Sequence, residues 1–271
     1  MQSTVGIYSS DYLLLLELTY LLENEMPDVR VELFGSKEFL DGLPAETLEQ
    51  ISEDPSGLLA TDVAVILSPL PGLADFPAKY DGTILDMSGA GGYSYDDTIL
   101  LTDPLFALLT EIAAINSDIA ITAGLPVAVY GRAGVDQLMQ ETRSIYSFEN
   151  YEDGALPMRL AFNIHFYPEK LPGGILADSV ENLRKYAPVS LRINPVSTAF
   201  IVDIAGCRPL ELPENLETFT PGEDFSLEDI TSGSAIALLT ASDGRLATLI
   251  GDYLHLKTAT LLRAVKAALG L

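Results

Sequence analysis

The side chains that could carry out chemistry in this sequence are few and widely separated. Cys207 is the single cysteine, and the arginine that follows it, Arg208, could favour the nucleophilic thiolate form. A plain structural cysteine in a loop is the interpretation that we favour. His165 has no acid or second histidine at ligand spacing, and His255 lies in the last predicted helix. A metal site needs three or four converging ligands, so we interpret both histidines as structural.

Cationic and glycine-rich segments supply the other candidates for a binding site. Arg192 carries a guanidinium group of the kind that grips a carboxylate, and Arg184 with Lys185 on the preceding predicted helix is a weaker candidate. In a chain so rich in acids, each could instead be a surface or ion-paired residue. Gly89-Ala90-Gly91-Gly92 follows a predicted strand, but no helix clearly follows it and the acidic segment 95–97 would repel phosphate. We interpret this glycine run as an ordinary loop.

The first hundred residues alternate between predicted strands and helices. Residues 5–8, 62–67 and 83–87 are apolar runs typical of buried strands, and residues 28–34 alternate between apolar and polar side chains. Asp11 is a suitable N-cap for a helix that begins directly after it. A strand, a helix and further strands in this order predict a parallel sheet with crossover helices.

From residue 104 the pattern changes to a mixture of strands and helices. Helices are predicted over 104–115, 133–147 and 254–269, strands over 119–130, 158–167, 188–194 and 198–205, and a hairpin over 236–250 around Asp243-Gly244. The helix of 133–147 is the most clearly amphipathic, and its apolar side consists of Val135, Leu138, Met139, Thr142 and Ile145. The fold class is therefore α/β, a Rossmann-like parallel-sheet domain plus an α+β domain with a mixed, mainly antiparallel sheet.

Composition limits the class of protein further. The chain has 271 residues, with 39 acids against 15 bases and a formal net charge of −24, so it lacks the basic cluster that nucleic acids or anionic membranes require. One cysteine excludes an internal disulfide or a cysteine-based zinc site. No basic n-region precedes Arg30 and no apolar run approaches the ~20 residues of a membrane span, so we expect a cytoplasmic protein. The acids could suit a salty cytosol or simply maintain solubility.

Four segments occur in an order that matches a known family. Residues 131–138 (GRAGVDQL) with 140–143 (QETR), 160–164 (LAFNI), 85–90 (LDMSGA) and 251–254 (GDYL) are collinear within residues 5–265. The first resembles the Gly-(Arg/Lys)-Ala-Gly-Val-x-x-Leu and Gln-Thr-Arg motif of the aspartate-semialdehyde dehydrogenases. The others are similar to that family's Ala-Phe-Asn strand, its Asp-Asn-Ser-Ser-Ala segment and the start of its closing helix. The chain is identified as a divergent, Usg-type member of this family.

The resemblance implies a domain plan and a reaction. The plan is a dinucleotide-binding domain over 1–103, an inserted dimerisation domain over 104–250, and a C-terminal helix over 251–271 that packs back on the first domain. The reaction is the NADP-dependent interconversion of an acyl phosphate and an aldehyde through a cysteine thiohemiacetal. A large self-complementary sheet face in the second domain predicts a two-fold homodimer.

At the positions that this resemblance assigns to catalysis, the chain carries the wrong residue types. The turn that should be rich in glycine is Tyr8-Ser9-Ser10-Asp11, where Asp11 would oppose a pyrophosphate. Leu105 or Phe106 stands in place of the nucleophilic cysteine, and Leu125 stands in place of a glutamine. The segment 195–200 lacks the expected histidine base. We therefore expect no bound cofactor, no metal and no catalytic residues.

Three functions follow from these observations, of which the first is the leading hypothesis. The chain is a non-catalytic, homodimeric binding or assembly module whose acidic surface would attract a basic protein partner. Alternatively, it is a pseudoenzyme that senses a small anionic metabolite through Arg192, at the position of the family's carboxylate-gripping arginine, with Arg184 as a weaker candidate. The third hypothesis is an NADP-dependent dehydrogenase with a relocated nucleophile, for example Cys207.

Overall fold

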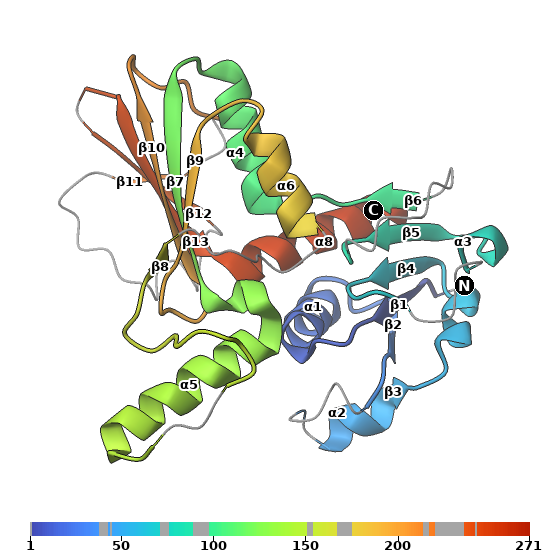
Figure 1. Ribbon diagram of the computed structural model, residues 1–271. Coiled ribbons are helices and arrows are strands. Elements are labelled where there is room, and N and C mark those ends of the chain that lie inside the picture. Colours follow the sequence, from blue (N-terminus) through green and yellow to red (C-terminus); the bar gives the residue numbers. More distant parts are fainter. Residues whose placement is uncertain are drawn as a thin grey trace. The chain divides into compact units, whose positions relative to one another are not determined.

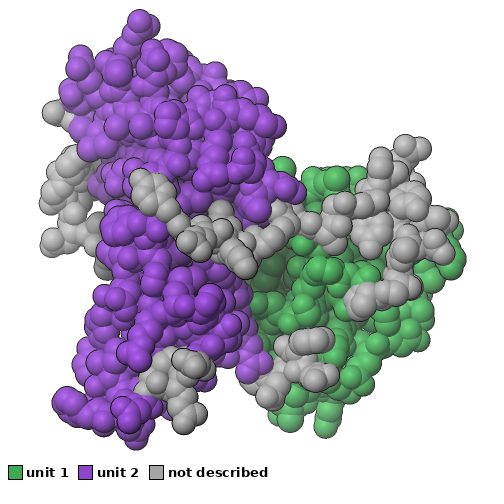
Figure 2. Space-filling model, in the orientation of Figure 1, with its two compact units in different colours: residues 1–103, 257–271 green, residues 104–256 purple. Residues whose placement is uncertain are grey.

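Two β-sheets organise the chain, and each belongs to its own compact unit. The computed structural model describes residues 2–37, 43, 45–70, 76–88, 98–150, 154–166, 175–213, 217–219, 236–241 and 243–271. Unit 1 comprises Met1–Asp103 together with Lys257–Leu271, and unit 2 comprises Pro104–Leu256 (Figure 2). Unit 2 is therefore inserted into unit 1, and the chain returns to unit 1 within its last helix.

Unit 1 contains a six-stranded sheet in the order β3-β2-β1-β4-β5-β6 (Figure 1). Every pair of neighbouring strands is parallel, which confirms the predicted parallel sheet. Its strands are β1 (Thr4–Tyr8), β2 (Arg30–Phe34), β3 (Ile51–Ser52), β4 (Val63–Ile66), β5 (Thr83–Asp86) and β6 (Thr98–Leu100). The strand order reverses between β1 and β4, and open α/β sheets bind their ligands at such a switch point, beyond the carboxyl ends of the strands.

The helices of unit 1 include one that comes from the far end of the sequence. They are α1 (Tyr12–Glu25), α2 (Ala45–Gln50), the 3-10 helix η1 (Pro55–Ala60), α3 (Phe76–Lys79) and most of α8 (Tyr253–Ala268). In α8, Lys266 Nζ lies 3.2 Å from Glu25 Oε2 and Lys257 Nζ lies 3.6 Å from Asp103 Oδ2. Asp103 is fully buried, so the cation from α8 helps to offset the cost of burying its charge.

Unit 2 contains a seven-stranded mixed sheet in the order β11-β12-β13-β10-β7-β9-β8. The strands are β7 (Ile119–Leu125), β8 (His165–Phe166), β9 (Val189–Ile193), β10 (Ala199–Gly206), β11 (Glu217–Phe219), β12 (Ile236–Thr240) and β13 (Leu246–Asp252). Helices α4 (Pro104–Ile115) and α6 (Ile175–Leu183) lie along one side of this sheet (Figure 1). Their apolar side chains and those of the central strands form the main core of the unit.

The hairpin is confirmed, but two of the predicted strands are shorter than expected. Strands β12 and β13 pair antiparallel around Gly244, whose φ of +68° suits a tight turn. The strand predicted over 119–130 ends at Leu125, because Pro126 lacks an N–H and Val127–Tyr130 forms the 3-10 helix η2. Of the strand predicted over 158–167, only His165–Phe166 pairs with a neighbour.

The apolar side predicted for the helix of 133–147 is right at Leu138 and Val135, which contact the core, and wrong at Met139 and Ile145. Helix α5 (Gly131–Ser147) buries Gly134, Gln137, Leu138 and Glu141, whereas Met139 and Ile145 are exposed. Two polar residues therefore lie on the inward face. Their partners are backbone groups of the segment that follows the helix, described below.

Tyr80 makes the stability of unit 1 depend on pH at the alkaline end. Its ring stacks on Phe76, with centroids 5.2 Å apart, and its hydroxyl lies 3.3 Å from Thr61 Oγ1. Burial raises the pKa of Tyr80 from 10.0 to about 12. The folded protein therefore holds a proton that the unfolded chain releases, so this contribution is complete below pH 10 and is lost as the pH rises towards 12.

We expect Tyr80→Phe to have a flatter stability profile than the natural chain between these pH values. Allowing for solvent screening, the natural chain should lose about 1–2 kcal/mol that the variant does not lose. Urea unfolding of both proteins at several pH values from 9 to 12 measures the difference. Parallel profiles for the two proteins would contradict the expectation.

Candidate functional site

The loop between β1 and α1 occupies the place where dinucleotide-binding folds hold a pyrophosphate. Here the backbone N–H of Ser9 donates to the carbonyl oxygen of Phe34 at 3.1 Å. The N–H of Ser10 donates to Ser68 Oγ at 2.9 Å. Because Ser68 follows β4, this hydrogen bond joins the carboxyl ends of β1 and β4 across the switch point. Ser9 and Ser68 are both buried, so the loop is closed by the chain itself.

The N–H groups of Asp11 and Leu13 are also bonded within the loop. The N–H of Asp11 donates to Ser9 Oγ at 3.0 Å, and Asp11 Oδ1 accepts the N–H of Leu13 at 2.9 Å. The predicted role of Asp11 as the N-cap of α1 is thus confirmed. Its carboxylate lies at the positive end of the helix dipole, which is the position that a bound phosphate would take.

The residues that the sequence resemblance assigns to the nucleophile and the glutamine lie in the apolar core of unit 2. Leu105 and Phe106 on α4 and Leu125 at the end of β7 are all fully buried, and all three belong to the same cluster. None has an atom that could attack a carbonyl carbon. These side chains therefore stabilise the unit by packing.

Arg192 is a half-buried cation on strand β9 of the mixed sheet. Strand β9 places it beside Gly124 on β7 and Phe166 on β8. Its Nε is buried and has no hydrogen-bond partner, and the structure shows no ion pair for its guanidinium among the described residues. Gly124 is needed beneath it, since a Cβ there would lie 2.9 Å from Arg192 Nε and 2.4 Å from Asn194 Nδ2.

Arg184 and Lys185 are ordinary surface cations by comparison. They lie in the turn directly after α6, not on the helix as predicted. Arg184 forms an ion pair with Glu181, and Lys185 Nζ lies 3.4 Å from Asn182 Oδ1. Exposed pairs of this kind contribute little to stability or to binding.

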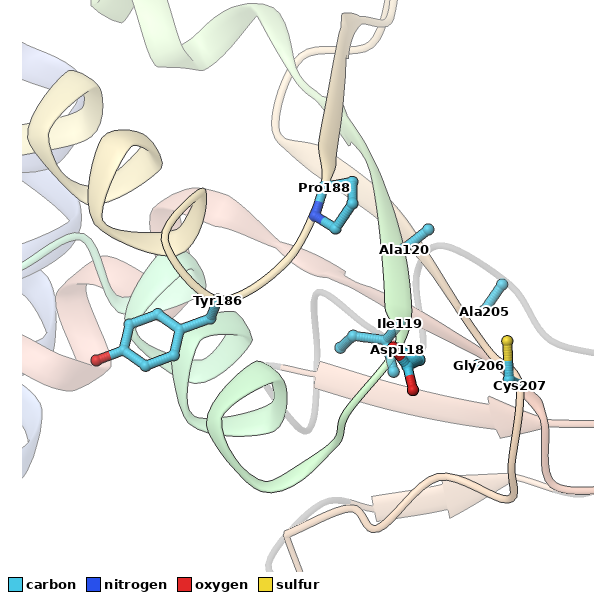
Figure 3. Close-up of a pocket in the computed structure, with 8 residues that line it drawn as sticks. All are labelled: Asp118, Ile119, Ala120, Tyr186, Pro188, Ala205, Gly206 and Cys207. Carbon is cyan, nitrogen blue, oxygen red and sulfur yellow. The ribbon is translucent and has the colours of Figure 1, made fainter.

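Cys207 is exposed directly after β10 and lines an open hollow of about 520 Å³. The other lining residues are Asp118, Ile119, Ala120, Tyr186, Pro188, Ala205 and Gly206. Figure 3 shows the thiol and Asp118 at one end, while the Tyr186 ring points away from both. No histidine is among these residues, so the hollow offers a thiol without the base that activates a nucleophile.

The two histidines form no metal site within the part of the chain that the structure describes. The ring Nε2 of His165 lies within hydrogen-bond distance of the carbonyl oxygen of Arg159, and the backbone N–H of His255 donates to Asp252 Oδ1 at 2.9 Å. No group of three or more histidine, cysteine, aspartate or glutamate side chains in that part could hold a metal ion. The glycine run 89–92 lies outside the described residues.

No helix within the described ranges has the length and apolar character needed to cross a membrane.

Sequence reasoning missed a polar clamp formed by Gln137 and Glu141 on α5. Glu141 Oε2 accepts the N–H groups of Leu160 and Ala161, both at 2.7 Å, and its Oε1 accepts Gln137 Nε2 at 2.9 Å. Gln137 Nε2 also donates to the carbonyl oxygen of Met158, and its Oε1 accepts the N–H of Leu156. The clamp fixes residues 156–161 against the helix and takes the N–H groups that the predicted strand would have used.

A parallel sheet ordered 3-2-1-4-5-6 and a mainly antiparallel second sheet define a two-unit α/β protein with a Rossmann-like half. Several solved aspartate-semialdehyde dehydrogenases are similar to the chain in structure. The structure of a probable aspartate-semialdehyde dehydrogenase from Pseudomonas aeruginosa matches with a TM-score of 0.74 and 16% identity, over 98% of this chain and 99% of that chain. Aspartate-semialdehyde dehydrogenase II from Vibrio cholerae matches with a TM-score of 0.73 and 13% identity, over 98% of this chain and 99% of that chain.

A third match is the enzyme from Candida albicans, solved with NADP, with a TM-score of 0.60 and 12% identity over 99% of both chains. No family model matches the sequence, and no curated protein matches it either. The chain therefore has the fold of the aspartate-semialdehyde dehydrogenases. At the level of the fold, the resemblance seen in the sequence motifs is confirmed.

Proposed function

We propose that this chain uses the aspartate-semialdehyde dehydrogenase fold without its chemistry, as a homodimeric binding or assembly module. The observation that carries the proposal is the closed loop between β1 and α1. There the N–H groups of Ser9, Ser10, Asp11 and Leu13 are all bonded to other groups of the chain. A dinucleotide would have to break these bonds before it could use the same donors.

Electrostatics add to this obstacle. The carboxylate of Asp11 caps the helix where a pyrophosphate would sit. Two like unit charges about 4 Å apart repel by about 4 kcal/mol at the effective dielectric constant of about 20 that suits protein surfaces. Such repulsion is comparable to what a few hydrogen bonds to phosphate could return. We therefore expect NADP to bind very weakly.

The chemical step lacks its groups as well. Leu105, Phe106 and Leu125 are packed in the core of unit 2, so the positions assigned to the nucleophile and the glutamine hold only apolar side chains. Removing a nucleophile alone costs about a million-fold in rate in well-studied hydrolases. The absence of a nucleophile at these positions supports a non-catalytic role.

The mixed sheet supports the homodimer. Phe200, Val202 and Ile204 of β10 are buried in the core, while Ile201 and Asp203 between them point to the opposite face and are only half-buried. Strand β13 alternates in the same way, with half-buried Thr248 and Ile250 on that face. Among the described helices, α4 and α6 lie on the core side (Figure 1). A second copy can cover such a face under two-fold symmetry, and the net charge of −24 favours basic proteins as further partners.

Two measurements on the purified protein test this function. We expect calorimetric titration with NADP to show no binding at micromolar concentrations, together with no NADP-dependent oxidation of aspartate semialdehyde. Sedimentation equilibrium should show a dimer at micromolar protein. Micromolar affinity for NADP, or measurable turnover, would contradict the non-catalytic assignment, and a strict monomer would contradict the assembly role.

Arg192 favours one second candidate, a sensor of small anions. Within the described residues its partly buried guanidinium forms no ion pair and its Nε has no hydrogen-bond partner, so it can accept a carboxylate without first giving up another partner there. The same calorimeter, loaded with succinate or aspartate, tests this candidate. Arg192→Ala should abolish any binding and the exposed Arg184→Ala should preserve it, whereas no heat with the natural chain excludes the sensor.

A further inference from the structure

The C-terminal half of α5 exposes apolar side chains that the fold does not use. Phe148 is 98% exposed and Tyr146 is 71% exposed, and Ile145 beside them is exposed as well. Phe162, in the segment clamped against α5, is 64% exposed. We call Ile145, Tyr146, Phe148 and Phe162 the tip patch. Figure 1 shows this end of α5 projecting away from the mixed sheet of its unit.

The backbone makes two of these phenylalanines more unusual. Phe148 has a φ of 57° and Phe162 a φ of 60°, in the left-handed region that bulky side chains rarely occupy. Phe148 ends α5, where its N–H donates to the carbonyl oxygen of Ile145, and glycine or asparagine is the usual residue at that position. Neither burial nor local geometry explains a phenylalanine at either place. Strain that is retained at exposed positions points to a function of the side chains.

The tip patch is held in a fixed arrangement before any partner arrives. The rings of Tyr146 and Phe162 meet edge to face, with centroids 6.1 Å apart and an interplanar angle of 76°. Glu141 binds the N–H groups of Leu160 and Ala161, which directly precede Phe162. Aromatic side chains that are already ordered lose little conformational freedom on binding, and aromatic residues dominate the energetics of protein interfaces.

The charges around the patch favour a second copy of the chain over a basic protein as the partner. The chain as a whole carries −24, yet the exposed charges that flank Tyr146 are one of each sign, Arg143 and Glu149. They lie three residues before and three residues after Tyr146, and neither forms an ion pair within the described residues. A two-fold axis perpendicular to the chain at Tyr146 reverses its direction in the second copy, so a contact centred there brings Arg143 of one copy towards Glu149 of the other. A basic partner would instead be expected at an acidic surface.

We propose that the tip patch is an anchor of the homodimer and packs against the same patch of a second copy. This inference rests on the dimer of the proposed function and adds to the sheet face named there a second contact about the same two-fold axis. The contact is isologous, with the four apolar side chains at its centre and the two opposite charges at its rim. Exclusion of water from the aromatic rings supplies the affinity, and the charge pairs fix the register.

The first test replaces the strained phenylalanines in the full chain. Phe148→Gly and Phe162→Gly should each raise the dissociation constant of the dimer at least tenfold in sedimentation equilibrium. Glycine relieves the positive φ, so the urea midpoint, measured for all chains at a protein concentration below the dissociation constant, should stay the same or rise, which separates lost docking from lost folding. Tyr20→Ala, at an aromatic residue of α1 that is 65% exposed, is the matched control and should leave the dissociation constant unchanged.

The second test exchanges the charges. Arg143→Glu or Glu149→Arg alone should weaken the dimer several-fold, and the double exchange should restore it. A dimer that is unaffected by both glycine variants overturns this anchor and leaves the proposed homodimer standing. Failure of the double exchange to restore association overturns the two-fold register, and a natural chain that stays monomeric overturns the proposed homodimer together with its anchor.

Discussion

Replacing Glu141 with alanine is expected to lower the free energy of unfolding of unit 2 by about 3–5 kcal/mol. The carboxylate is buried and accepts two backbone N–H groups at 2.7 Å and the amide of Gln137 at 2.9 Å. Alanine would leave the N–H groups of Leu160 and Ala161 buried without a partner. It would also open a cavity beneath residues 156–161, so transfer and hydrogen-bond losses act in the same direction.

Urea or thermal unfolding of the full chain measures this effect, and two variants control it. Glu141→Gln keeps the shape and one acceptor oxygen, so it should lose a smaller part of the stability. Glu111→Ala, at an exposed glutamate of α4, should change the free energy of unfolding by less than about 0.5 kcal/mol. An alanine variant at residue 141 as stable as the Glu111 control would show that the clamp contributes nothing.

Phe106→Ala should cost about 3–5 kcal/mol of stability, because it removes a fully buried ring from the core of unit 2. The expectation distinguishes a packing position from a vacant catalytic one. If residue 106 still bordered a substrate cavity, truncation of its ring would meet solvent and cost little. Ile115→Ala on the same helix is the matched control, since Ile115 is half exposed and should lose less than about 1 kcal/mol.

Unfolding monitored by circular dichroism provides the measurement for both residues of α4. Phe106→Leu should lie between the natural chain and Phe106→Ala, since it restores most of the lost apolar contact. An alanine variant at 106 that unfolds with the midpoint of the Ile115 control would show that the side chain is not part of the core. The assignment of this position to packing would then be withdrawn.

The buried strands and the start of the first helix could be predicted from short stretches of sequence. The apolar runs at 62–67 and 83–87 are β4 and β5, and Asp11 caps α1 as its residue type indicates. Strands β3 and β6 were not predicted, because two or three residues at a sheet edge carry no periodic signal.

The site was harder to predict, because its decisive contacts join distant segments. The hydrogen bond from Ser10 to Ser68 spans 58 positions of the sequence and exists only because β1 and β4 are neighbours. The inward face of helix α5 was mispredicted for a related reason. Helical periodicity assumes that the inward face meets apolar side chains, whereas α5 meets backbone N–H groups, which select Gln137 and Glu141. A glutamine and a glutamate four residues apart on an otherwise apolar side were the signal that could have revealed the clamp.

The insertion of unit 2 into unit 1 has a consequence for how the protein matures on the ribosome. Unit 2 is one continuous stretch of chain, whereas unit 1 needs Lys257–Leu271 as well as its first 103 residues. Translation therefore delivers everything that unit 2 needs while unit 1 still lacks its last helical turns and the lysine that faces buried Asp103. During that interval the nascent Rossmann-like half has an incomplete core, and it is the part of the polypeptide for which chaperones would have the longest access.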